Sequence, residues 1–204
     1  MHAETLLDIA MKHANTLITG AQRGDEKALN NLVSLWYKRI YNYAFKYMSE
    51  HDLASEIAQK TFIAMFKGIH KLKEVDRFKP WLYRIATNLC YEEERRNRQV
   101  KTVSLTVSRN EEMEEAKGSR YNPERSFQQL ELEIVLLEAL SEISDEHRSI
   151  VIMKEYEGLK FREIAEVLDV SENTVKTRLY AGLNNLKDIL KKKNITRETV
   201  YYEL

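Results

Sequence analysis

Residues 158–190 read GLKFREIAEVLDVSENTVKTRLYAGLNNLKDIL and contain two amphipathic helical patterns separated by a short break. In the first pattern, apolar residues over 161–168 recur every three or four positions, which places them on one face of a short helix. Asp169, Val170 and Ser171 interrupt this pattern, and serine is a preferred residue at helix N-caps. The second pattern also has one apolar face, formed by Val175, Leu179, Leu183, Leu186 and Leu190. The segment therefore predicts a helix-turn-helix.

The second of these helices is expected to read DNA, because a helix-turn-helix places the N-terminal part of its second helix in the major groove. Its outward side chains have suitable chemistry: asparagine pairs with adenine, glutamate accepts from cytosine, and lysine reaches guanine or a phosphate. These outward residues are Glu172, Asn173, Lys176, Thr177 and Tyr180, flanked by Arg178. A helical hairpin with a solvated polar face has a similar pattern and stays open as an alternative.

The rest of the sequence also favours helices. Its 204 residues include only six glycines and two prolines, so the turn residues that many short strands require are scarce. The single cysteine, Cys90, cannot form an internal disulfide, which fits a reducing cytoplasm. The apolar runs are far shorter than the ~18 residues of a membrane span, and the N-terminus does not resemble a signal peptide. We therefore expect an all-α cytoplasmic protein without direct membrane insertion.

Residues 14–98 are expected to form a first helical domain. Helices are predicted from Leu17 to about Arg23, Asp25 to Met48, Asp52 to Gly68 and Pro80 to Arg98, with a polar, basic loop at residues 69–77. The formal net charge of the whole chain is zero, but residues 14–98 hold 15 Lys and Arg against 10 Asp and Glu. The positive charge typical of a nucleic-acid binder is thus concentrated in this half.

Helical periodicity fails over residues 99–126, where several glutamates, Gly118 and Pro123 take the place of large apolar residues. This composition predicts an acidic flexible linker. Periodicity returns at Phe127. The expected organisation is therefore two small helical domains, residues 14–98 and residues 127–193, joined by the linker 99–126 and followed by a tail, residues 194–204.

Catalytic or metal-binding patterns do not stand out in the sequence. The five histidines are scattered without zinc-ligand spacing, and there is no glycine-rich phosphate-binding loop. We therefore expect a protein that is not an enzyme and that has no metal site and no cofactor.

Both halves of the sequence resemble one known family. Residues 138–190, EALSEISDEHRSIVIMKEYEGLKFREIAEVLDVSENTVKTRLYAGLNNLKDIL, closely resemble the domain of bacterial RNA polymerase sigma factors that reads the promoter −35 element. EIAQKTFIAMFKGI at residues 56–69 and RFKPWLYRIATNLCYEEERRNR at residues 77–98 resemble the domain that reads the −10 element. Two such domains and a linker are the pattern of the extracytoplasmic-function (ECF) subfamily. The resemblance implies a protein that binds core RNA polymerase, directs promoter-specific initiation and helps to melt the −10 region.

The resemblance also implies specific contact residues and partners. Core polymerase would be bound by Glu56, Gln59 and Phe62. The −10 element would be contacted by Lys71, Lys73, Arg77, Arg84, Asn88, Arg95 and Arg96. The −35 element would be contacted by Arg148, Glu172, Asn173, Thr174, Lys176, Thr177 and Arg178. Many members of the family are held inactive by an anti-sigma factor, so such a partner is expected beside core RNA polymerase and promoter DNA.

The sequence departs from the family pattern at several positions. Ser55 and Lys60 replace residues that are usually acidic, and Asp169 stands in the turn where glycine is usual. Aspartate tolerates left-handed backbone better than most residues, so the turn is still expected to form. Two other functions stay open: an operator-binding helix-turn-helix regulator, and a helical adaptor that binds no DNA. Residues 17–98 lack the alternating strand–helix pattern that a receiver domain of the first alternative would show.

Overall fold

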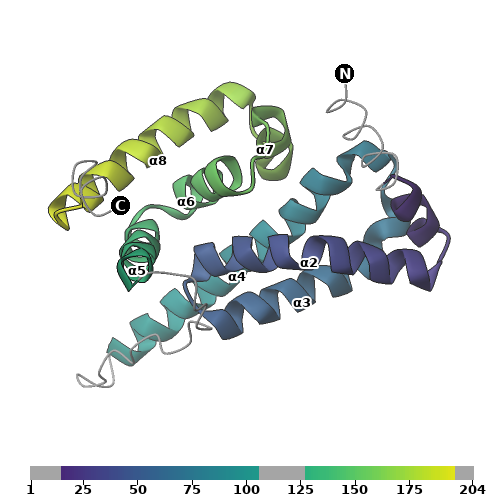
Figure 1. Cartoon of the computed structure of the whole chain (residues 1–204), viewed down its shortest axis with the longest axis horizontal. Helices are drawn as coiled ribbons and strands as arrows, with labels where there is room; N and C mark the ends of the chain where they lie inside the picture. The colour runs from purple at the N-terminus through teal and green to yellow at the C-terminus, as the bar shows by residue number, and fades with distance from the viewer. Residues whose placement is uncertain (1–14, 106–126, 196–204) are drawn as a thin grey trace.

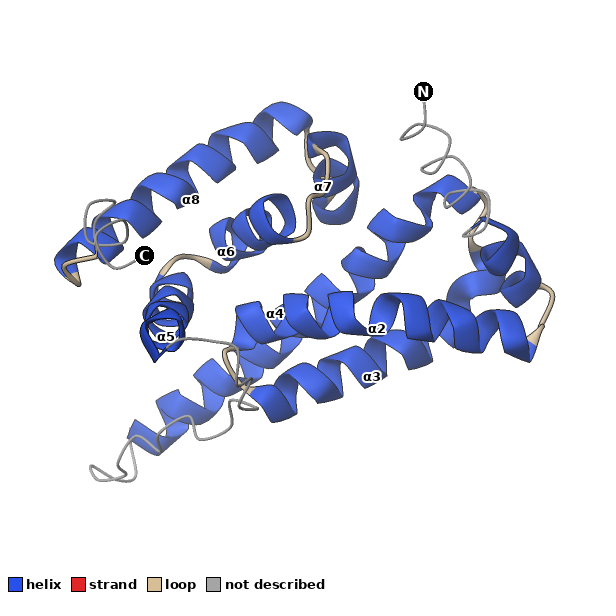
Figure 2. Ribbon diagram, viewed as in Figure 1, coloured by secondary structure: helices blue, strands red, loops and turns tan. Residues whose placement is uncertain are grey.

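The computed structural model describes residues 15–105 and 127–195, and this part of the chain is built from helices, with no strand (Figures 1 and 2). The first half contains a helical segment at residues 15–22, then α2 (Glu26–Met48), α3 (His51–Gly68) and α4 (Phe78–Leu105). The second half contains α5 (Phe127–Glu142), α6 (Asp145–Val151), α7 (Phe161–Leu168) and α8 (Glu172–Lys192). The prediction of an all-α chain with two helical domains is confirmed.

Local sequence explains the limits of α2. The Asp25 carboxylate accepts hydrogen bonds from the backbone N–H groups of Lys27 at 2.8 Å and Ala28 at 3.2 Å. It thereby satisfies N–H groups that no carbonyl within the helix can reach. At the other end, Ser49 adopts left-handed backbone with a φ of 58° and turns the chain into α3.

A tyrosine-rich core holds α2, α3 and α4 together. Tyr43, Tyr47 and Tyr83 are fully buried. The hydroxyls of Tyr43 and Thr87 share a hydrogen bond of 2.8 Å, and the rings of Tyr43 and Tyr83 meet edge to face at 5.5 Å. Because burial penalises the phenolate, the pKa values of Tyr43 and Tyr83 are raised well above the ordinary value. These tyrosines are therefore structural residues of the first domain.

The predicted helix-turn-helix is confirmed as α7 and α8. Asp169 ends α7 in left-handed backbone, with φ 56° and ψ 48°, the conformation that glycine most often supplies at this position. Ser171 caps α8, because its Oγ accepts from the N–H of Thr174 at 3.0 Å. Gly182 brings α8 close to α6: a Cβ at this position would lie 3.0 Å from the Cβ of His147.

The last helix of the first domain is longer than the sequence predicts. Because α4 continues to Leu105, the first seven residues of the expected linker, 99–105, are helical. Just before this extension, Arg96 pairs with Glu93 at 2.6 Å and Arg98 with Glu94 at 3.4 Å, and such pairs three or four residues apart stabilise the helix where they lie. The rest of the expected linker, residues 106–126, lies outside the described residues, so its flexibility and the domain boundaries remain predictions.

Two further segments depart from regular helix or loop. The expected loop at residues 69–77 contains two short 3-10 turns, Ile69–Lys71 and Val75–Arg77. In the second domain, α6 continues as a π-helical turn, Ile152–Tyr156. The first of these segments carries the candidate residues Lys71, Lys73 and Arg77.

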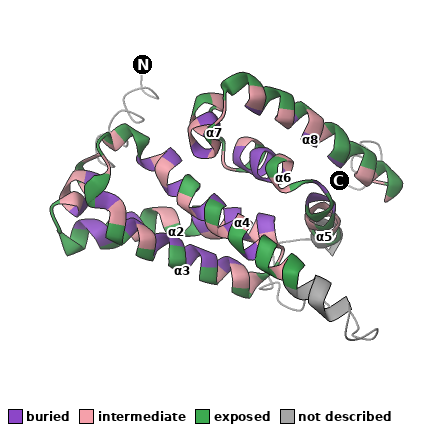
Figure 3. Cartoon of the chain, turned by 180° about the vertical axis from the view of Figure 1, so that it is seen from behind, coloured by how far each residue is buried: buried purple, intermediate pink, exposed green. Residues whose placement is uncertain are grey.

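The two domains lie against each other (Figure 1). α4 packs beside α7, and α2 contacts α5 and the π-helical turn. Figure 3 shows exposed residues along the outer side of α8, which faces away from the first domain. The predicted contact residues of α4, Arg84, Asn88, Arg95 and Arg96, are exposed as well.

Candidate nucleic-acid interface

The N-terminal half of α8 presents polar side chains to solvent. The exposed ones are Glu172, Asn173, Lys176 and Thr177. On the opposite side of the helix, Val175 and Leu179 are buried in the second domain and fix its rotation. The N-terminus of a helix carries partial positive charge, which favours phosphate nearby. This half of α8 is thus open to a DNA groove.

Two other residues predicted to contact the −35 element are partly engaged within the protein. Thr174 is half-buried, and its hydroxyl hydrogen-bonds that of Ser171 at 2.8 Å. Arg178 is also half-buried and pairs with Glu146 of α6 at 3.1 Å. These contacts hold α8 in the helix-turn-helix, so both residues support the exposed readers as well as being candidates for DNA contact.

The basic loop between α3 and α4 is held in place by Gln22. The Nε2 of Gln22 donates to the carbonyls of Ile69 at 3.2 Å and Leu72 at 2.7 Å. The loop exposes the predicted residues Lys71, Lys73 and Arg77. Arg77 pairs with Glu74 at 2.9 Å, but an exposed pair of this kind contributes only about 0–1 kcal/mol, so a phosphate can replace it.

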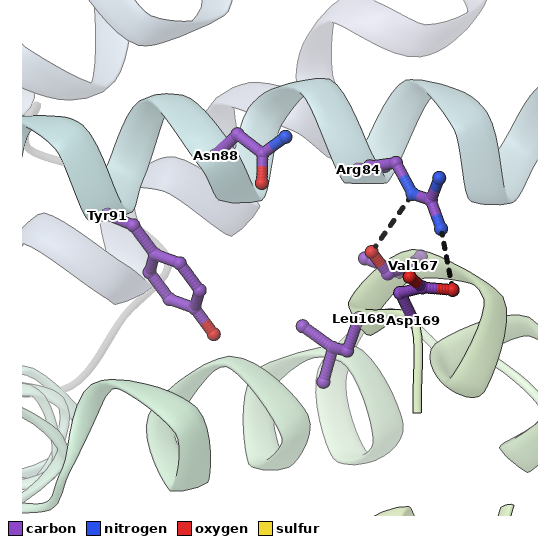
Figure 4. Close-up of a pocket in the computed structure, with 6 residues that line it drawn as sticks. All are labelled: Arg84, Asn88, Tyr91, Val167, Leu168 and Asp169. Carbon is purple, nitrogen blue, oxygen red and sulfur yellow. Dashed lines mark hydrogen bonds and ion pairs between the residues drawn. The ribbon is translucent and has the colours of Figure 1, made fainter. Parts of the chain in front are cut away.

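Arg84 of α4 is bonded to the end of α7 (Figure 4). Its Nε donates to the carbonyl of Val167 at 3.2 Å, and its Nη2 donates to the carbonyl of Glu166 and lies 4.0 Å from the Asp169 carboxylate. These carbonyls form the negative end of α7, which attracts a guanidinium. A cleft of about 250 Å³ between the two domains is lined by Arg84, Asn88, Tyr91, Val167, Leu168 and Asp169.

The other two arginines predicted to contact the −10 region lie farther along α4. Arg95 and Arg96 are exposed, about three helical turns beyond Arg84. Arg96 pairs with Glu93, which is buried. The structure thus brings Arg84 and Asn88 together at the cleft and separates them from Arg95 and Arg96.

Arg148 lies in a different environment from the one that its predicted phosphate contact requires. It is only 3% exposed. Its Nη1 donates to the carbonyl of Tyr47 at 3.0 Å, and its Nη2 donates to the carbonyls of Ser141 at 2.7 Å and Ile143 at 3.4 Å. The guanidinium is therefore buried and bound to protein carbonyls of both domains, so this structure does not place it where a phosphate can reach it.

The residues predicted to bind core polymerase lie on α3. Glu56 and Gln59 are exposed. A hydrogen bond from Lys60, with an N–O distance of 2.6 Å, lowers the pKa of Glu56, so this face remains charged. Phe62 differs from these two residues: it is only 8% exposed, and its ring stacks on Tyr37 with a centroid distance of 6.0 Å.

The sequence interpretation missed two exposed apolar residues on α3, Ile63 at 54% and Phe66 at 62% exposure. Both lie next to the predicted polymerase-binding residues. The sequence did not identify them, because an apolar residue on an amphipathic helix can lie either in the core or on the surface, and only the structure shows that these two are exposed. Phe62 is instead nearly buried beneath the exposed face of α3, where it packs against Tyr37 of α2.

The sequence interpretation also missed the polar pairs that join the two domains. The pairs are Tyr83 with Glu157 at 2.6 Å, Tyr91 with Ser149 at 2.7 Å, Lys79 with Glu163 at 3.2 Å, and Arg98 with Asp145 at 2.7 Å. The partners are between 47 and 84 residues apart in the chain. No local spacing relates such residues, so the sequence contained no pattern that could reveal them.

Within 15–105 and 127–195, no group of three or more His, Cys, Asp and Glu side chains is placed to hold a metal ion. No helix in these two ranges combines the length and the hydropathy that crossing a membrane requires.

Two sequence families match the chain. Residues 32–100 match the family described as Sigma-70 region 2, and residues 134–186 match the family described as Sigma-70, region 4. The first match covers most of α2, all of α3 and most of α4, and the second includes the helix-turn-helix. Most of each predicted DNA-reading helix therefore lies within a matched region.

Curated proteins are similar over most of the chain. The ECF RNA polymerase sigma factor SigW of Bacillus subtilis is 27% identical over 177 residues, which cover 85% of this chain and 95% of SigW. The ECF RNA polymerase sigma factor SigE of Mycolicibacterium smegmatis is 30% identical over 172 residues, which cover 83% of this chain and 65% of SigE.

Two solved structures share the fold. The structure of CnrH in complex with the cytosolic domain of CnrY aligns with a TM-score of 0.65 and 20% identity, covering 88% of this chain and 97% of that one. The co-crystal structure of the sigma factor RpoE with the anti-sigma factor NepR from Bartonella quintana aligns with a TM-score of 0.63 and 21% identity, covering 81% and 98%.

Proposed function

This chain belongs to the ECF subfamily of RNA polymerase sigma factors, which direct the polymerase to promoters, and from that premise we propose which of its surfaces carries each contact. The observation that carries the proposal is the solvent-exposed N-terminal half of α8 within a correctly capped helix-turn-helix. An operator-binding regulator is not favoured, because residues 32–100 match Sigma-70 region 2. Sigma factors are regulatory initiation factors, and we propose that this one has no enzymatic activity and acts in the cytoplasm.

We assign reading of the −35 element to α8. Glu172, Asn173 and Lys176 are exposed on its first two turns and offer an acceptor, a bidentate amide and a cation to base edges. Thr174, Thr177 and Arg178 flank them and add contacts to the DNA backbone. Each good base contact contributes about 1–3 kcal/mol of discrimination against the wrong base.

We assign melting of the −10 region to the basic loop and α4. Moving a base out of the stack costs a few kcal/mol, so the protein must stabilise the separated strand. The exposed Lys71, Lys73 and Arg77 supply positive charge on a loop that Gln22 fixes against the first helical segment. On α4, Arg84 and Asn88 would contact the strand at the cleft, and the exposed Arg95 and Arg96 would contact it about three helical turns farther along.

We assign core-polymerase binding to the outer face of α3. Glu56 and Gln59 supply charge and hydrogen bonding, and the exposed Ile63 and Phe66 supply apolar surface beside them. An interface with an apolar centre and a polar rim is typical of stable protein association. Phe62, which is nearly buried, would act by supporting this face.

We also propose that an anti-sigma factor controls this protein. The support is a likeness of fold: one structure with the same architecture is a sigma factor in complex with the anti-sigma factor NepR. Because 98% of that sigma-factor chain aligns with this one, a comparable partner would meet the same arrangement of helices here.

Run-off transcription with purified bacterial core polymerase tests the proposal. We expect new start sites on genomic promoter fragments when the protein is added. The double variant Asn173→Ala with Lys176→Ala should lose most of this activity. Its matched control is Asn185→Ala with Lys187→Ala, which changes the same residue types at exposed positions farther along α8. No protein-dependent transcript and no binding to core polymerase would overturn the proposed function.

A second comparison tests the assignment to α3. Glu56→Ala with Phe66→Ala should weaken binding to core polymerase in a pull-down assay. Its control is Glu26→Ala with Leu35→Ala, which changes the same kinds of exposed residue on α2. Equal losses in both pairs would contradict a specific role for α3.

A further inference from the structure

Gln22 binds both ends of the first 3-10 turn in the basic loop between α3 and α4. Its Nε2 donates to the carbonyl of Ile69 at 3.2 Å, where the turn begins, and to the carbonyl of Leu72 at 2.7 Å, directly after the turn. An amide nitrogen has two N–H donors, so one side chain can supply both hydrogen bonds. The turn carries Lys71, and Lys73 follows it. Gln22 therefore fixes the backbone from which both lysines project.

Asn15 binds the second 3-10 turn of the same loop. Its Nδ2 donates to the carboxylate of Asp76 at 3.2 Å, and Asp76 directly precedes Arg77. Asn15 and Gln22 are separated by about two helical turns, so their side chains lie on the same face of the helical segment at residues 15–22. These two residues, called the amide face below, thus bind both turns of the loop. The match to Sigma-70 region 2 begins at residue 32, so the amide face lies outside it.

The start of the loop is also held from the side of α4. Gly68 is the last residue of α3, and a Cβ at this position would lie 3.1 Å from the ring of Trp81. Glycine therefore allows the Trp81 ring to lie close to the backbone that leads into the loop. Trp81 packs in turn against the buried Phe78, with 6.0 Å between the ring centroids. The loop is thus fixed from two sides, by α4 and by the amide face.

We propose that Asn15 and Gln22 are positioning residues for promoter melting, which hold Lys71, Lys73 and Arg77 in the arrangement that the separated −10 strand requires. The proposal rests on the proposed function, in which this loop stabilises that strand. A loop that becomes ordered only when it binds loses conformational entropy at that moment, and a loop that is already fixed avoids this loss. The amide face therefore prepares the loop to capture the strand.

The contacts of the amide face indicate which step of initiation it affects. Polymerase binding is assigned to α3 and reading of the −35 element to α8, whereas Asn15 and Gln22 bind the loop. Loss of the two amides should therefore slow the melting of a bound promoter and change its initial binding little. A promoter whose −10 strands are already unpaired should be much less affected, because no re-pairing competes with the loop there.

The first experiment measures promoter opening by the full chain with bacterial core polymerase, on a promoter found by run-off transcription. Permanganate reactivity of unpaired thymines gives the rate of opening. In Asn15→Ala with Gln22→Ala this rate should fall about tenfold, while the dissociation constant of the initial complex stays within about twofold of wild type. On a template with mismatches across the −10 element the rates should differ less than about twofold. The matched control, Asn30→Ala with Asn31→Ala, removes two exposed amides of α2 and should open the promoter as wild type does.

The second experiment tests whether the amides act through the lysines. Lys71→Ala with Lys73→Ala removes charges that the amide face is proposed to position. Gln22→Ala alone should slow opening about fivefold, since it removes two hydrogen bonds to the loop. Added to the lysine variant, Gln22→Ala should slow opening further by less than about twofold, because residues that act through one another are not additive.

The outcomes separate this inference from the proposed function. If Asn15→Ala with Gln22→Ala opens the promoter at the wild-type rate, or is impaired equally on the mismatched template, the amide face does not position the loop for melting. If Gln22→Ala causes its full loss in the lysine variant as well, it does not act through the lysines. If the wild-type protein supports no polymerase-dependent transcription, the proposed function itself fails.

Discussion

The guanidinium of Arg148 donates to the carbonyl oxygen of Tyr47 at 3.0 Å, although the two residues are 101 positions apart in the chain. The same guanidinium lies 4.8 Å from the centre of the Tyr47 ring and donates from its second nitrogen to Ser141, near the end of α5. One buried side chain thus joins the C-terminal ends of a helix from each domain. Arg148 is therefore central to the way in which the two halves meet.

Replacing Arg148 with methionine should lower the free energy of unfolding by about 2–4 kcal/mol, because the carbonyls that it binds are left without a donor. Urea denaturation followed by circular dichroism would measure the change. Arg148→Lys keeps the charge but reaches fewer carbonyls, so it should lower the free energy of unfolding less than Arg148→Met does. Arg162→Met removes an exposed arginine of α7 and should change stability by less than about 0.5 kcal/mol. Equal effects at positions 148 and 162 would contradict the role of Arg148.

Asp169 should tolerate glycine but not a β-branched residue. Its backbone is left-handed, with a φ of 56°, so Asp169→Gly should keep or slightly raise the melting temperature. Asp169→Val should cost about 1–3 kcal/mol, because valine is strained in this region. Differential scanning calorimetry would compare both with Asp188→Val, an exposed change in ordinary helix. A harmless Asp169→Val would show that the turn between α7 and α8 adopts another conformation.

Enlarging Gly182 should push α8 away from α6. A Cβ at this position lies 3.0 Å from the Cβ of His147 and 3.2 Å from a methyl group of Val151. Gly182→Val should therefore destabilise the protein by about 1–3 kcal/mol in thermal denaturation. Asn184→Val, an exposed change two residues along the same helix, controls for the helix propensity of valine. The prediction fails if the two variants melt at the same temperature.

Ionisation of Tyr91 should weaken the fold at high pH. Burial raises the pKa of Tyr91 to about 12, whereas an unfolded tyrosine has a pKa of about 10. The folded state therefore holds this proton more tightly, and the contribution of Tyr91 to stability is present below about pH 10 and is lost as the pH rises toward about 12. Urea unfolding across this range should show a shallower decline in Tyr91→Phe than in the wild type. Identical declines would contradict the shift.

Local sequence was sufficient for the elements that carry the family resemblance. The positions of α7 and α8, the Ser171 cap and the left-handed Asp169 all follow from residues within a few positions of one another. The end of α4 was harder to predict, because the helical pattern of apolar residues weakens after Arg98 although the helix continues to Leu105.

The candidate site was predictable only in part. The exposed face of α8 follows from helical periodicity, because the buried positions Val175 and Leu179 determine which side chains point outward. Burial of Phe62 and exposure of Phe66 did not follow, since both are aromatic residues on the same helix. Their difference depends on where α2 and Tyr37 lie against α3.

The sequence by itself determined that this protein is helical and has two domains, because periodicity and capping are properties of neighbouring residues, and its two motif segments carried the resemblance to the sigma factors. Only the tertiary structure decided that Arg148 is buried and that Arg84 is bonded to the end of α7. Both facts depend on how two separately encoded helical domains dock. Docking brings together carbonyls and guanidinium groups that are about 80 to 100 residues apart in the chain. Local patterns such as helical periodicity relate only residues a few positions apart, so they cannot predict these contacts.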